Sequence, residues 1–112
     1  MSSTSETEVE KFFREAATSL SMRDLYNADV QAREVLARAP GHAGAQNLLG
    51  IIAARLGLFD AAERYFRDAL AADASFQPAV GNIEKLATAR ANTAPDAAPG
   101  ERFLLIKSWH AG

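Results

Sequence analysis

The sequence LLGIIAARLGLFDAAERYFRDAL, residues 48–70, decides the fold that we expect for this chain. Its large apolar residues recur three or four positions apart on both sides of Gly57, which is the spacing of amphipathic helices. Gly57 ends the first helix, because glycine just after the last residue of an apolar stripe is a signal for a helix end. The stretch therefore predicts two helices joined by a short turn.

The same spacing continues outward from this pair and predicts five helices in all. Apolar stripes begin at Phe12, Leu25, Leu48, Phe59 and Ala79. Ser5 followed three residues later by Glu8 predicts a capping box ahead of the first helix. Pro40 and Pro78 fall at the borders of these segments, where proline is tolerated. The fifth helix is expected over about residues 76–91.

Charged residues on the polar faces agree with helices. Acidic residues precede basic ones by four positions in the pairs Glu10–Arg14, Asp29–Arg33, Glu34–Arg38, Asp60–Arg64 and Glu63–Arg67. Each such pair contributes only about 0.3–0.5 kcal/mol, so the pairs indicate helix more than they add stability.

The composition excludes several classes of function. The 112 residues are 48% hydrophobic, and alanine is the most frequent of these, which suits closely packed helices. Twelve basic residues against fourteen acidic ones argue against a nonspecific nucleic-acid binder. The absence of cysteine excludes disulfides, thiolate metal sites and a cysteine nucleophile. We expect no nucleic-acid partner and no cofactor.

The predicted helices form an internal repeat. Its period is the separation in residue number that superposes Ala28 on Ala62. The same shift superposes Arg33 on Arg67 and Leu36 on Leu70. It also superposes Ala45 on Ala79, Leu49 on Ile83 and Ile52 on Leu86. A single unit of such a repeat cannot cover its own apolar face, so neighbouring units are expected to stack.

The residues of the middle unit resemble the tetratricopeptide repeat family. The resemblance is carried by Leu49, Gly50, Gly57, Phe59, Ala62, Phe66, Ala69, Leu70 and Asp73, and in the first unit by Ala28, Leu36 and Pro40. It covers about residues 9–90. It implies an all-α fold, an α-solenoid of stacked antiparallel helix pairs with two repeat units and a capping fifth helix. Gly50 and Ala62 would be small because paired helices cross closely there.

Two positions depart from the family pattern. In the first unit, Glu15 stands where Leu49 and Ile83 stand in the other units, and in the middle unit Ala74 stands where the family usually has proline. A slip of one residue before the first turn would instead direct Phe13, Ala17 and Leu20 inward. The register of the first helix therefore stays open.

The resemblance implies a concave groove, lined by the first helix of each pair, that binds a peptide segment of a partner protein. The candidate groove residues are Phe13, Ala17, Leu20, Asn47, Ile51, Ala54, Arg55, Lys85 and Thr88. Asn47 would hold a peptide backbone, and Arg55 and Lys85 would meet carboxylates. Phe13 and Ala17 occupy places where some members of the family hold chaperone C-termini with Lys and Asn, which disfavours that role.

No arrangement of residues indicates catalysis, and we do not expect an enzyme. His42 and His110 lie in different segments, without the spacing of a metal site. His42 is expected to be a solvent-facing turn residue. No glycine-rich phosphate loop and no nucleophile with a base at motif spacing is present.

The ends of the chain predict its domain organisation. Residues 1–5 are expected to be a disordered N-terminus, 6–91 the helical domain, 92–100 a linker and 101–112 a short apolar tail. Three placements are open for the apolar run Phe103–Ile106. It could pack on the last helix, pair as a strand with a second copy of the chain, or form the first strand of a following domain. Residues 103–112 faintly resemble the start of a bacterial glycosyltransferase-like domain. That likeness leaves an alternative function, an N-terminal accessory or oligomerisation domain of a larger bacterial protein.

The apolar segments of the chain predict where the protein is located and whether it self-associates. Residues 1–10 lack the apolar core of a signal peptide, and no run is long enough to span a bilayer, so we expect a cytoplasmic protein without a membrane partner. A fifth helix with no partner of its own would leave apolar surface, such as Ile83 or Leu86, for the tail or a second copy.

Overall fold

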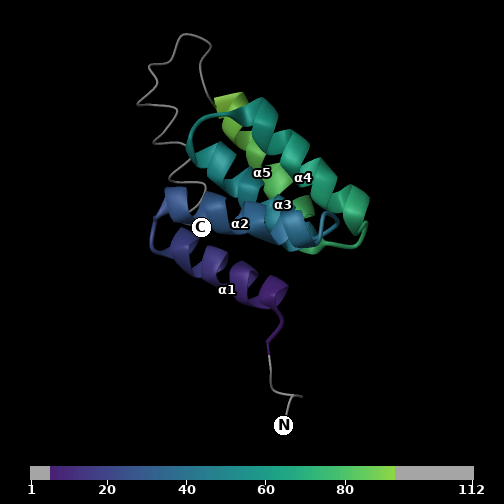
Figure 1. The fold of residues 1–112 in the computed structure, drawn as a ribbon. Helices are drawn as coiled ribbons and strands as arrows, with labels where there is room; N and C mark the ends of the chain where they lie inside the picture. The colour runs from purple at the N-terminus through teal and green to yellow at the C-terminus, as the bar shows by residue number, and fades with distance from the viewer. Residues whose placement is uncertain (1–5, 93–112) are drawn as a thin grey trace.

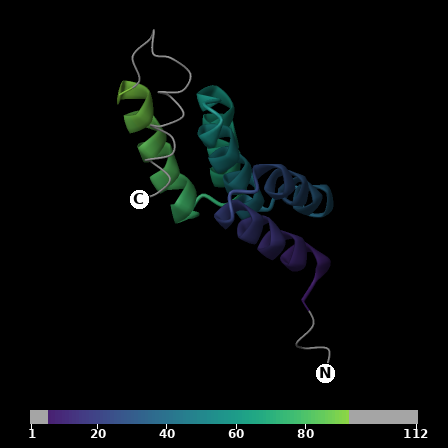
Figure 2. The same ribbon diagram turned by 90° about the vertical axis from the view of Figure 1, so that its left-hand side faces the viewer.

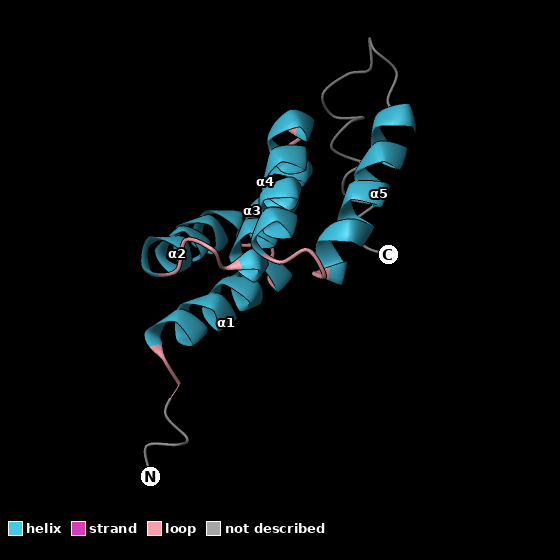
Figure 3. Ribbon diagram, turned by 90° about the vertical axis from the view of Figure 1, so that its right-hand side faces the viewer, coloured by secondary structure: helices cyan, strands magenta, loops and turns pink. Residues whose placement is uncertain are grey.

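The computed structural model describes residues 6–92, and within that range it contains five α-helices and no strand (Figures 1 and 3). The helices are α1 (Glu8–Ser21), α2 (Leu25–Arg38), α3 (Ala43–Arg55), α4 (Phe59–Ala72) and α5 (Gln77–Asn92). The predicted all-α fold is confirmed for this range. The predicted N-terminal segment 1–5, the tail 101–112 and all of the linker after Asn92 lie outside the described residues.

The helices form two antiparallel pairs and a fifth helix beside them. α1 packs against α2 and α3 packs against α4, each pair joined by a short turn (Figure 1). α2 packs against α3 and α4 against α5, while α3 also contacts both α1 and α5. α2 also reaches α4 through a hydrogen bond from Arg33 Nη2 to the hydroxyl oxygen of Tyr65 at 3.2 Å. Figure 2 shows the result as three consecutive layers, with the α3–α4 pair in the middle.

The turns inside the two pairs have the same backbone structure and lie one repeat period apart. Met22 has φ −88° and ψ 4°, and Leu56 has φ −87° and ψ 2°. The N–H of Asp24 donates to the carbonyl of Ser19 at 2.8 Å, and that of Leu58 donates to the carbonyl of Ala53 at 2.9 Å. Such bonds satisfy the last carbonyls of a helix as the chain reverses. The period seen in the sequence is thus present in the backbone.

The central residue of each turn has the left-handed conformation. Gly57 has φ 78°, and Arg23, its counterpart in the first turn, has φ 65°. A side chain in this region strains the backbone, because its Cβ approaches the carbonyl oxygen. The first turn therefore carries a strain that glycine removes from the second.

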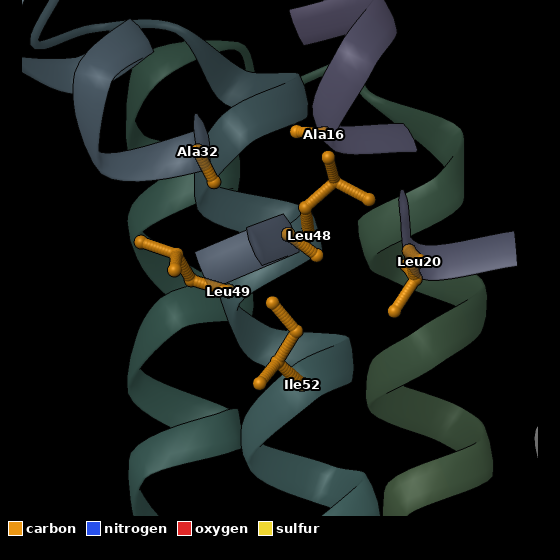
Figure 4. Packing of buried hydrophobic residues seen from close by; sticks show 7 residues of the cluster. Ala16, Leu20, Ala32, Leu48, Leu49 and Ile52 are labelled. Carbon is orange, nitrogen blue, oxygen red and sulfur yellow. The ribbon is translucent and has the colours of Figure 1, made fainter. Parts of the chain in front are cut away.

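Two clusters of buried side chains hold the layers together. The first joins α1, α2 and α3, and Figure 4 shows Leu48, Leu49 and Ile52 of α3 beside Ala16 and Leu20 of α1 and Ala32 of α2. The second joins α3, α4 and α5 through Ala53, Ala54, Ala62, Phe66, Leu86 and Ala89. Because α3 contributes to both clusters, it links the first pair to α5.

Residues that the repeat superposes are buried alike. Ala28 and Ala62, Ala32 and Phe66, and Val35 and Ala69 are all 0% exposed. At the second of these places, alanine in α2 is replaced by phenylalanine in α4, and the ring of Phe66 lies over Gly50. A Cβ added to Gly50 would lie 2.4 Å from Phe66 Cε1 and 2.5 Å from Cδ1. The predicted close crossing at Gly50 therefore holds, with the ring filling the space of the missing side chain.

Several local predictions are wrong in detail. The capping box is formed by Thr7 and Glu10, not by Ser5 and Glu8, because the helix begins at Glu8. Glu10 accepts from the N–H of Thr7 at 3.0 Å, so it does not pair with Arg14.

The surface ion pairs were predicted only in part. Arg14 pairs with Glu6 instead of Glu10, at 2.8 Å. Asp60 of α4 pairs with Arg90 of α5 at 3.0 Å, and the predicted ion pair between Asp60 and Arg64 does not form. The pairs Asp29–Arg33, Glu34–Arg38 and Glu63–Arg67 form as predicted. Sequence spacing alone does not reveal the competing partners from other helices.

Burial settles two questions that the sequence left open. Ala16 is 0% exposed while Ala17 is exposed, so the first helix follows the register of the repeat. Of the residues that the one-residue slip would direct inward, Leu20 is buried and Phe13 packs against the first cluster, but Ala17 is not buried. Leu86 is 2% exposed because it enters the second cluster, contrary to the expectation that it lies at the surface. Ile83 is half-buried against the same cluster.

The crossing at Gly50 gives a prediction with a matched control. Gly50→Ala should lower the free energy of unfolding by about 1–3 kcal/mol, because the new methyl group overlaps the ring of Phe66. Gly81→Ala should raise it by about 0.5–1 kcal/mol, since alanine favours helix, and nothing lies within 4 Å of a Cβ at Gly81. Urea denaturation of both variants tests this. A Gly50→Ala protein as stable as the wild type would contradict the crossing.

Candidate functional site

The nine candidate residues lie on α1, α3 and α5, which contact one another through α3. Their exposure divides them into three groups: Leu20, Asn47 and Ala54 are buried; Phe13, Ile51 and Arg55 are half-buried; Ala17, Lys85 and Thr88 are exposed. We use the name A face for the surface formed by the last two groups. Burial of the first group leaves its members little surface for contact with a peptide.

Phe13 connects α1 to the start of α3. Its ring centroid lies 4.7 Å from that of His42, and a Cβ on Gly44 would lie 2.7 Å from Phe13 Cζ. Glycine at residue 44 therefore lets the phenylalanine ring approach the backbone of α3. Phe13 keeps part of its surface exposed and is part of the A face.

His42 has a structural role that the sequence prediction missed. It is the N-cap of α3, and its Nδ1 accepts from the N–H of Ala45 at 3.1 Å. It is half-buried rather than solvent-facing, because its ring packs on Phe13. A neutral imidazole nitrogen can replace the usual capping oxygen. The one available signal was its position immediately before an apolar helix.

Asn47 holds α3 to α5. It is 7% exposed, and its Oδ1 accepts from Asn82 Nδ2 at 2.9 Å. A buried amide requires such a partner, because an unpaired polar group loses its hydration without compensation. Asn82, which the sequence analysis did not single out, completes this contact. The predicted contact of Asn47 with a peptide backbone competes with this structural bond.

Arg55 is placed at the C-terminal end of α1. Its Nη1 donates to the carbonyl of Leu20 at 3.3 Å, where the negative end of the helix dipole favours a cation. Burial lowers the pKa of the Arg55 guanidinium, and the positive charge of Arg23 lowers this pKa further. Among the described residues, no carboxylate lies within ion-pair distance of Arg55.

The exposed part of the A face is small and weakly polar. The Thr88 hydroxyl donates to the carbonyl of Glu84 at 3.2 Å, and its oxygen can still accept hydrogen bonds. Lys85 forms no ion pair with the described residues, and Ala17 adds a bare methyl group. The accessible surface thus combines small side chains with cations.

The described helices give no sign of a metal or of a membrane span. Within residues 6–92, no three or more histidine, cysteine, aspartate or glutamate side chains come close enough to hold a metal ion. No helix in the same range has the length and apolar character needed to cross a bilayer.

Comparisons with known proteins identify no relative. A scan against protein-family models, a search of curated proteins and a search of solved structures each found no match to this chain. The likeness to the tetratricopeptide repeat family therefore stays a prediction, argued from the residues and the backbone.

The Asn47–Asn82 bond gives a second prediction. Asn47→Ala should destabilise the fold by about 1–3 kcal/mol, since Asn82 loses the acceptor for its amide. The double-mutant cycle with Asn82→Ala should give a coupling energy of about 0.5–1.5 kcal/mol, measured by urea unfolding. Thr88→Ala on exposed α5 surface serves as the control and should change stability by less than about 0.5 kcal/mol. A coupling energy of zero would show that the bond does not stabilise the α3–α5 contact.

Proposed function

We propose that this chain is a tetratricopeptide-repeat-like interaction module that binds a peptide segment of a partner protein on its A face. The observation that carries the proposal is the recurrence of the turn backbone, with its dihedral angles and hydrogen bonds, after one period of the sequence repeat. A backbone that repeats together with its buried positions is typical of stacked repeat proteins. Such proteins use the surface lined by equivalent helices for recognition.

The chemistry of the A face supports a peptide ligand. Phe13 and Ile51 supply half-buried apolar surface, and Arg55 and Lys85 supply cations that lack a carboxylate among the described residues. Apolar anchors with a few charged groups suit a segment that carries both apolar and acidic residues. A surface of this size supports affinities of about micromolar Kd.

The exposed members of the A face allow a test that leaves the core intact. The full chain first captures partner proteins from a cell lysate, and the purified partner is then titrated by calorimetry. A triple variant, Ala17→Glu, Lys85→Glu and Thr88→Glu, should weaken binding by about tenfold or more, because it removes one cation and adds three acids to the surface. These substitutions spare the buried Asn47 and Leu20, so folding is preserved.

A control variant alters an equal number of exposed residues on α4. Arg64→Glu, Asp68→Lys and Ala71→Glu lie on a helix outside the A face and should leave affinity unchanged. Equal affinity of the A-face variant and the wild type would remove this function. It would leave the alternative, an accessory or oligomerisation domain of a larger protein, whose predicted basis lies outside the described residues.

A further inference from the structure

Exposed apolar side chains gather where the two helix pairs make their turns. Met22 is 74% exposed, and Leu56 and Leu58 are each 54% exposed. Met22 and Leu56 are equivalent in the repeat, and each follows the last residue of its helix, α1 or α3. The bond from Arg55 to the Leu20 carbonyl, 3.3 Å, brings these two helix ends together. We call the surface of Met22, Arg23, Arg55, Leu56 and Leu58 the turn edge.

The turn edge carries two positive charges without compensation. Arg14, Arg33, Arg38, Arg67 and Arg90 each pair with a carboxylate, whereas Arg23 and Arg55 have none among the side chains of residues 6–92. Both residues lie at the same helix end, because the N–H of Arg23 and Nη1 of Arg55 donate to the carbonyl of Leu20, at 2.9 and 3.3 Å. Like charges held together favour an anion between them.

The nearest acid in the sequence is engaged elsewhere. Asp24 caps α2: its Oδ1 accepts from the N–H of Asn27 at 3.2 Å, and its Oδ2 accepts from Asn27 Nδ2 at 2.7 Å. Its carboxylate is therefore directed at the start of α2 and does not neutralise the two arginines. The turn edge therefore combines exposed apolar side chains with two guanidinium groups that pair with no carboxylate of residues 6–92.

Arg23 occupies its place at a conformational cost. Its φ is 65°, while the equivalent residue of the second turn is Gly57 with φ 78°. Glycine in this place avoids the steric strain and is the usual choice after a helix. Strain that the neighbouring unit avoids points to a use for the side chain, since such outliers cluster at binding sites.

We propose that the turn edge binds a short acidic segment of a partner protein that also carries apolar side chains. Carboxylates of the segment pair with Arg23 and Arg55, and its apolar side chains cover Met22, Leu56 and Leu58. Guanidinium groups bind carboxylates in a bidentate manner, which sets the polarity of the ligand. The turn edge shares Arg55 with the A face but contains none of its other residues. Its second cation, Arg23, and its apolar side chains belong to the turns, so this surface goes beyond the function proposed above.

Three synthetic peptides of equal length test the proposal on the full chain by fluorescence anisotropy. The first alternates Leu with Glu, the second replaces each Glu by Lys, and the third replaces each Leu by Ser. We expect the first peptide to bind with a Kd of about micromolar order, weakening as salt rises. The second and third peptides should show no saturable binding.

Arg23→Gly separates recognition from stability. Glycine removes a cation and also relieves the strain, so this variant should melt at a higher temperature yet bind the first peptide about tenfold more weakly. A loss of binding therefore cannot come from unfolding. Arg64→Glu is the control, because Arg64 is exposed on α4, lacks a described carboxylate and lies outside the turn edge. It should bind as the wild type does.

Four results would overturn the proposal. They are equal binding of the first and second peptides, equal binding of the first and third, unchanged affinity of Arg23→Gly, and a loss in Arg64→Glu as large as that in Arg23→Gly. A different occupant would also overturn it. If the occupant is the chain's own tail, a peptide of residues 101–112 binds in an Arg23-dependent manner. If it is a membrane surface, anionic vesicles do so. If it is a second copy of the chain, sedimentation shows a dimer that Arg23→Gly dissociates.

The A-face triple variant distinguishes the two surfaces. It should keep the part of Leu–Glu peptide binding that Arg23→Gly removes, because none of its substitutions lies on the turn edge. A loss of that Arg23-dependent binding in the triple variant would place the acidic ligand on the A face and overturn the turn-edge proposal.

Discussion

The contact between the ring of Phe66 and the bare backbone of Gly50 is the constraint on which the rest of the structure depends. It brings α4 close enough to α3 for Ala62 to be fully buried between the two helices. The same cluster includes Leu86 and Ala89 of α5. One glycine therefore sets both the spacing inside the second pair and the place where the third layer docks. Within residues 6–92 no sixth helix pairs with α5, and Leu86 and Ala89 give it apolar contacts in this cluster.

Much of this arrangement follows from the sequence because small residues leave few alternatives. Gly57 predicted a turn and the turn is there, and the superposition of Ala28 on Ala62 predicted two positions that are both fully buried. The helix bounds Leu25–Arg38 and Phe59–Ala72 differ by one repeat period at both ends. These features are local or periodic, so spacing alone reveals them.

The candidate site was less predictable because polar side chains choose partners across helices. Asn47 looked available for a peptide, but Asn82, on a different helix, occupies its carbonyl oxygen. His42 looked like an ordinary turn residue, but it caps a helix and packs on Phe13. Asp60 has a basic residue four positions on, yet it pairs with Arg90. A hydrogen bond or ion pair of this kind depends on how the helices are arranged, which a pattern of spacing does not encode.

The position of α3 explains where recognition can occur. It lies between the first pair and α5, and nine of its thirteen residues are buried, compared with two in α1 and three in α5. A helix covered on both sides has little side-chain surface left, so its candidate contacts Asn47 and Ala54 serve the core. Besides Ala43 and Gln46 near its start, α3 still offers its half-buried Ile51 and its C-terminal end. At that end Arg55 and Leu56 remain accessible, and the neighbouring turn supplies a second cation at Arg23. Binding energy is therefore available at the margins of this module, where the helices end, more than along its central helix.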